Sequence, residues 1–145
     1  METATNAKHL KVLGRADAAR LGDAAIVRQF VIDLVKQVGM EPIGEPVVHD
    51  VPLEIAKLDR EPFQDEGGIT TQLVGFHTLS TSHVAIHTWP LRQEFHLDLY
   101  SCREFDKHVV GDFIQEVLHT DEMIATDLTY ACEWESYRNP DGSVG

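Results

Sequence analysis

The sequence predicts an α+β fold, a two-layer sandwich in which an antiparallel sheet carries two helices packed on one face. Residues 94–100 alternate strictly between apolar and polar side chains, which is typical of a half-buried strand. Residues 24–38 and 107–118 instead repeat apolar side chains at helical spacing. The order along the chain is strand, helix, strands, helix, strand. Helices against an antiparallel sheet are the simplest packing of that order.

The first half of the chain opens with a short strand at residues 9–13. Asp23 is suited to cap the first helix, and Gly39 is its natural stop. The apolar stripe of this helix comprises Ile26, Val27, Phe30, Val31, Leu34, Val35 and Val38. Residues 41–68 hold four prolines, so we expect loops there, with one strand near residues 47–51.

The second half reads as strands with one helix between them. Residues 69–79 and 82–89 are expected to be strands that precede the alternating segment 94–100. Asp106 precedes the second amphipathic helix, and a last strand is expected near residues 125–134.

Composition narrows the class of protein. A chain of 145 residues with 43% apolar and 25% charged side chains predicts one globular domain, residues 1–145. The net charge of −12 argues against nucleic acid, because phosphate binding needs clustered Lys and Arg. No apolar run approaches the roughly 20 residues that cross a bilayer, and we expect no leader peptide or membrane contact. Cys102 and Cys132 are the two cysteines, too few for a disulfide scaffold, which favours a reducing cytoplasm.

The most informative segment is the run SHVAIHTWP, residues 82–90. A Ser82 hydroxyl held against the carbonyl of Thr81 can attack it and turn the amide into an ester. Elimination then breaks the chain and leaves a dehydroalanine, which hydrolyses to a pyruvoyl group; both steps need a base. His87 is the candidate base. Strand residues five apart point to opposite faces, so the two side chains meet only if the chain bends or bulges.

Two further readings of this region stay open at this point. Cys102 is either a small buried apolar residue or a thiol that returns a proton to a substrate carbon. His83 and His87 share a strand face and suggest a metal site, completed by His77 or His96. Each histidine can equally be an ordinary hydrogen-bonded residue of the sheet.

The run at residues 82–90 resembles the self-cleavage and catalytic segment of the prokaryotic S-adenosylmethionine decarboxylases, with HTWP as its most specific part. Residues 98–102, DLYSC, resemble that family's IDLFTCG segment at the same distance from HTWP. His9 and Leu10 stand where the family has a GRHL start. Both expected helices fall where the family has its own.

The resemblance implies a role for each residue. Ser82 becomes the pyruvoyl cofactor that forms a Schiff base with substrate, His87 assists processing, and Cys102 donates a proton. Cleavage between Thr81 and Ser82 gives mature chains 1–81 and 82–145, in a homodimer that pairs through its sheets. The implied reaction is decarboxylation of S-adenosylmethionine in polyamine (spermidine) biosynthesis, in the cytoplasm.

Three positions depart from the family pattern. Thr81 replaces the glutamate that usually precedes the cleaved serine, and Val74 stands where the family carries an active-site serine. Leu91 replaces the glutamate that binds the ribose hydroxyls of the substrate. The segment 50–67 is long for the family.

These departures leave two alternatives within the same superfamily. One is a pyruvoyl-dependent decarboxylase of ornithine or arginine, whose cationic side chain could meet the polar strand positions Glu94, His96 and Asp98. The other is an unprocessed, non-catalytic homologue that serves as a partner for an active enzyme.

Overall fold

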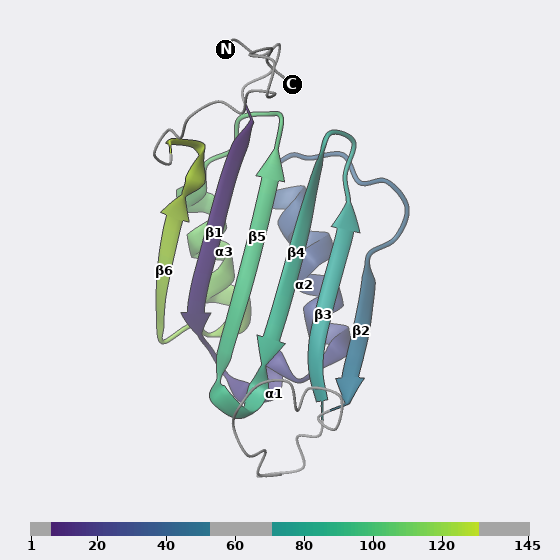
Figure 1. The fold of residues 1–145 in the computed structure, drawn as a ribbon, viewed down its shortest axis with the longest axis vertical. Coiled ribbons are helices and arrows are strands. Elements are labelled where there is room, and N and C mark those ends of the chain that lie inside the picture. Colours follow the sequence, from purple (N-terminus) through teal and green to yellow (C-terminus); the bar gives the residue numbers. More distant parts are fainter. Residues whose placement is uncertain (1–6, 53–70, 131–145) are drawn as a thin grey trace, which may run out of the picture.

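A computed structural model describes residues 7–52 and 71–130 of the chain, which form one six-stranded sheet and three helices (Figure 1). The strands are β1 Lys8–Arg15, β2 Val47–Pro52, β3 Thr71–Thr78, β4 Ser82–Trp89, β5 Glu94–Ser101 and β6 Glu122–Asp127. The helices are α1 Ala18–Leu21, α2 Ala24–Gln37 and α3 Lys107–Leu118, with 3-10 turns at Pro90–Arg92 and Leu128–Tyr130.

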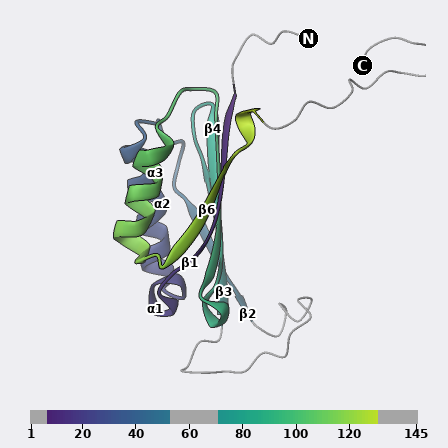
Figure 2. The ribbon, with the colours of Figure 1, turned by 90° about the vertical axis from the view of Figure 1, so that its left-hand side faces the viewer.

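The strands lie in the order β2-β3-β4-β5-β1-β6, and every neighbouring pair is antiparallel. In Figure 2 the three helices lie on the same side of this sheet. The predicted antiparallel sheet and the α+β class are therefore confirmed. We refer to the side with the helices as the helix face and to the other side as the open face.

The sequence predicted two helices, and the structure adds a third, α1. This helix has only four residues, which is too short to show an apolar period. Asp17 caps it by accepting a hydrogen bond from the backbone N–H of Ala19 at 2.9 Å.

The predicted cap Asp23 and the predicted stop Gly39 of the first helix are confirmed. The Asp23 carboxylate accepts from the N–H groups of Ala25 and Ile26, which fixes the start of α2. Gly39, with φ of +68°, follows the end of that helix in the left-handed region that glycine adopts at little cost. Asp106 accepts from His108 N–H in the same way at the start of α3.

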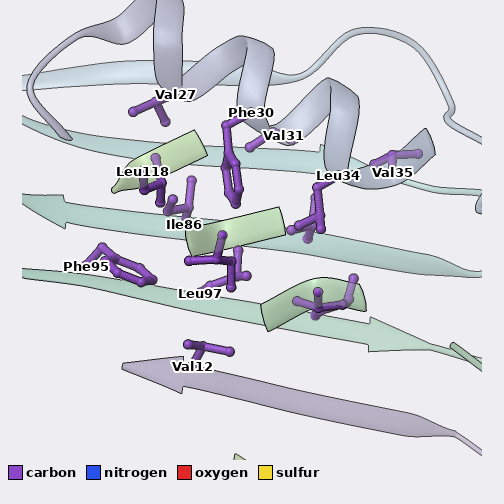
Figure 3. Packing of buried hydrophobic residues seen from close by; sticks show 14 of the residues in the cluster. Val12, Val27, Phe30, Val31, Leu34, Val35, Ile86, Phe95, Leu97 and Leu118 are labelled. Carbon is purple, nitrogen blue, oxygen red and sulfur yellow. The ribbon is translucent and has the colours of Figure 1, made fainter. Parts of the chain in front are cut away.

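The core lies between the helices and the sheet. Phe30 of α2 stacks on Phe113 of α3, with ring centroids 5.6 Å apart. Figure 3 shows Phe30 and Leu34 pointing toward Ile86 and Leu97 of the sheet. Alternate residues of β4 and β5 are buried, so each strand has one set of side chains in the core and another on the open face.

Other element boundaries differ from expectation by a few residues. The strand expected near residues 125–134 begins earlier, at Glu122, because that residue pairs with Arg15 of β1. Residues 131–134 lie outside the described residues, as do the expected loop at 53–68 and Cys132. Within residues 7–52 and 71–130, no helix combines the length and apolar character needed to cross a membrane.

Candidate functional site

The hairpin between β3 and β4 carries the expected cleavage position. Leu79 N–H donates to Ser82 O at 2.9 Å, and Ser82 N–H donates to Leu79 O at 3.4 Å. Ser80 and Thr81 therefore form a two-residue turn. The Thr81–Ser82 peptide bond lies at the point where this turn enters β4, at the end of the sheet where β5 also finishes (Figure 1).

The Ser82 side chain points to the helix face and bonds to a second serine. Ser82 pairs with Ser101 in the register of β4 and β5, and its Oγ donates to Ser101 Oγ at 3.0 Å. Ser101 is fully buried, and its Oγ also accepts from Arg103 N–H at 2.9 Å. Sequence reasoning missed Ser101, because its importance comes from strand register, although its place beside Cys102 was a signal.

Cys102 lies directly after Ser101, at the end of β5. It is half-buried and has a free thiol. Its side chain is hydrogen-bonded to Tyr100, and this contact raises the pKa of Tyr100. Ser82 and Cys102 therefore stand at the ends of adjacent strands, with the Ser82 hydroxyl toward the helix face and the thiol in contact with Tyr100 of the open face.

His87 does not join this pair. The ladder between β4 and β5 runs from Ser82 to Trp89 without a bulge, so His87 stands on the open face about 17 Å along the strand from Ser82. Partial burial lowers the pKa of His87, neighbouring His96 lowers it further, and Asp98 opposes the shift. No bend brings the two side chains of one protomer together.

Aromatic rings gather on the open face around Tyr100. His83 stacks on Tyr100 with ring centroids 5.4 Å apart, and His9 meets the same ring edge-on at 5.9 Å. Asp98 lies between the two histidines, 2.6 Å from His9 Nε2 and 3.5 Å from His83 Nε2. Phe76 continues the row across β3 and is 45% exposed.

The metal alternative finds no support in this geometry. His77 lies on the helix face, opposite to His83 and His87, because it is buried in the core side of β3. In the described part of the chain no three His, Cys, Asp or Glu side chains come close enough to hold a metal ion.

The end of β4 far from Ser82 leads to Leu91, one of the three positions that depart from the family pattern. Leu91 sits in the 3-10 turn between β4 and β5, and Trp89 pairs with Glu94 beside it. A cavity of about 250 Å³ opens next to Glu94 and is lined in part by Glu122 and Met123. The carboxylates of Glu94 and Glu122 lie at the end of the sheet opposite to Ser82, about seven residues away along β4.

Comparisons with known proteins agree on one group. A family model described as S-adenosylmethionine decarboxylase matches residues 10–129. Over 47 residues the chain is 36% identical to the S-adenosylmethionine decarboxylase proenzyme of Bacillus velezensis, a match that covers 32% of this chain and 37% of that relative. The crystal structure of the adenosylmethionine decarboxylase from Aquifex aeolicus is similar with a TM-score of 0.64 and 19% identity, covering 94% of this chain and 100% of that one. That likeness is one of fold.

Proposed function

Because the chain belongs to the S-adenosylmethionine decarboxylase family, we propose that it is a proenzyme that cleaves itself and then decarboxylates S-adenosylmethionine. The proposal treats residues 1–145 as one domain that becomes chains 1–81 and 82–145. The observation that carries it is the placement of the Ser82 hydroxyl and the Cys102 thiol at the ends of two neighbouring strands.

The surroundings of Ser82 suit its conversion into a pyruvoyl group. The serine opens β4 directly after a turn, so cleavage before it breaks a loop and leaves the strand ladder intact. Ser101 would stay beside the new chain terminus as a hydrogen-bond donor. When formed, a pyruvoyl group supplies an electrophilic carbonyl that draws electrons from the bond to the departing carbon dioxide.

Cys102 is the proposed proton donor. Cys102 follows Ser101, the strand partner of Ser82, so its backbone lies next to the position where the pyruvoyl group would form. The hydrogen bond from Tyr100 to this side chain restricts where the sulfur can point. We assign to Cys102 the delivery of a proton to the substrate carbon that loses the carboxylate.

The role of His87 requires a second copy of the chain. His87 cannot approach Ser82 of its own protomer, since it stands on the opposite face and several residues along the strand. The exposed rings of the open face favour a homodimer that pairs through its sheets, where His87 of one protomer would assist processing of the other by removing the Cα proton of Ser82 in the elimination step.

A mixing experiment tests this arrangement. The His87→Ala chain, which keeps Ser82, is co-refolded with a tagged Ser82→Ala chain, which keeps His87. Cleavage of the His87→Ala chain only in the mixture would support assistance across the dimer. Cleavage of His87→Ala alone at the rate of the unmodified chain would remove His87 from processing.

Substrate choice is tested by carbon dioxide release from labelled S-adenosylmethionine, ornithine and arginine. We favour S-adenosylmethionine because the family and its relatives carry that name. Leu91 lacks the carboxylate that would accept hydrogen bonds from ribose hydroxyls, which is the observation favouring a basic amino acid. Release from ornithine or arginine but not from S-adenosylmethionine would overturn the first choice and keep the pyruvoyl chemistry.

A further inference from the structure

His77 is a buried histidine whose hydrogen bonding is incomplete. Its side chain is 2% exposed, and its Nδ1 has no hydrogen-bond partner. A polar atom left unpaired in a core lowers stability by about 1–3 kcal/mol, so its presence in a folded protein requires an explanation, such as a functional role. We propose that His77 is the base that takes the hydroxyl proton of Ser82 in the first step of self-cleavage, the attack on the Thr81 carbonyl, which leaves the later elimination to His87; this rests on the proposed proenzyme.

The hairpin register places His77 near Ser82 and on the same face. His77 pairs with Val84, while Leu79 and Ser82 close the turn two residues further on. His77 and Ser82 are therefore diagonal neighbours, with Cα atoms about 7–8 Å apart, a separation that an imidazole ring can span. Both side chains lie on the helix face, because Ser82 bonds there to the buried Ser101.

The other histidines of this hairpin face the wrong way. Strands β3 and β4 carry three histidines, and two of them, His83 and His87, project from the open face. His83 stacks on Tyr100 and Phe76 there. His77 is thus the one histidine of these two strands that shares a face with the Ser82 hydroxyl.

The surroundings of His77 keep its ring neutral. Burial lowers the pKa of His77, the Arg28 guanidinium from α2 lowers it further, and the Glu45 carboxylate raises it. Arg28 and Glu45 are bound to each other at 2.8 Å, so their opposing charges are held together. A neutral imidazole has one nitrogen free to accept a proton, and Nδ1 of His77 has no hydrogen-bond partner that would occupy it.

The assigned step is an isomerisation that needs no other reactant. As Ser82 Oγ forms a bond to the carbonyl carbon of Thr81, its proton passes to His77. The bond from that carbon to Ser82 N then breaks, and the nitrogen takes the proton back from His77. The products are an ester between Thr81 and the Ser82 side chain, a free amine at residue 82 and a neutral histidine.

The test follows cleavage of the full-length chain by denaturing intact-mass spectrometry, with and without hydroxylamine, which cuts esters. His77→Gln keeps a polar side chain but removes the base, and we expect cleavage to slow by about 100-fold or more. Hydroxylamine should not cut this variant, since the ester does not form. The matched control is His49→Gln, an exposed histidine on β2, which should cleave at the unmodified rate.

A base and a merely structural residue are separated by chemical rescue. In His77→Ala, added imidazole should restore cleavage in a folded protein, as checked by circular dichroism. The assignment of His77 would be overturned if His77→Gln cleaved at the rate of the unmodified chain or accumulated the ester. It would also be overturned if imidazole did not restore cleavage in His77→Ala. An unmodified chain that never cleaves would instead refute the self-processing on which the assignment rests.

Discussion

Thr88, within the HTWP segment, is expected to hold that segment in place, and Thr88→Val removes its hydroxyl with little change in shape. The side chain is 1% exposed. Its Oγ1 donates to the carbonyl of Leu21, the last residue of α1, at 2.8 Å and accepts from Leu73 N–H at 3.2 Å. One hydroxyl therefore joins a helix end to two strands.

The magnitude follows from the two groups that the variant leaves unpaired. A buried donor or acceptor without a partner costs about 1–3 kcal/mol, and here one of each is stranded. Burying a methyl group in place of the hydroxyl stabilises the variant by about 0.8 kcal/mol. We therefore expect the free energy of unfolding to fall by about 1–5 kcal/mol.

Urea unfolding measures this loss, with Thr78→Val as the matched control. Thr78 is an exposed threonine on the neighbouring strand, where the same change should stay within about 0.5 kcal/mol. To keep self-cleavage from complicating the transition, both variants are compared in a Ser82→Ala chain. A Thr88→Val chain as stable as the control would refute the view that this threonine is a buried structural link.

Three other predictions concern the site. Cys102→Ala should cleave before Ser82 normally yet lose carbon dioxide release by about 100-fold or more, because only the proton donor is gone. With Tyr130 and Tyr137 changed to Phe, Cys102→Ala should lower the pKa of Tyr100 toward 10.0 in an absorbance titration, because the hydrogen bond that Tyr100 donates to Cys102 raises it. Urea stability should fall as pH drops below about 7, because the lowered pKa of His77 makes the unfolded chain take up a proton first.

Each of these has a clear contrary result. Unchanged turnover would remove Cys102 from the mechanism, and an unchanged Tyr100 titration would mean that the contact with sulfur is absent in solution. For the acid effect, the stability that a neutral His77 contributes is complete above pH 6.5, the pKa of His77 in the unfolded chain. It is lost as the pH falls toward the lower pKa of His77 in the folded chain. A His77→Gln chain with the same pH slope would assign the slope to other groups.

Local patterns in the sequence were enough to locate most of the fold. The Asp23 cap, the helix after Asp106 and the strand Ser82–Trp89 stand where they were predicted, because each depends on neighbours within a few residues. The period of two also indicated that Ser82 and His87 face apart, which the unbroken ladder confirms.

The remaining parts of the site depend on contacts between distant residues. Ser101 matters because it lies opposite Ser82 on the neighbouring strand β5. No pattern in the sequence reveals which strands are neighbours. Thr88 bonds to Leu21 across 67 positions of the chain. His77 was considered only as a metal ligand, because its burial and its unpaired nitrogen become visible once α2 covers its strand.

Denaturing intact-mass spectrometry of the purified, unmodified protein tests self-cleavage most directly. A self-cleaving chain yields two fragments, residues 1–81 and residues 82–145, with a pyruvoyl group at the start of the second. A single full-length mass that persists after long incubation would contradict self-cleavage, and the chain would then stand as a non-catalytic member of its family.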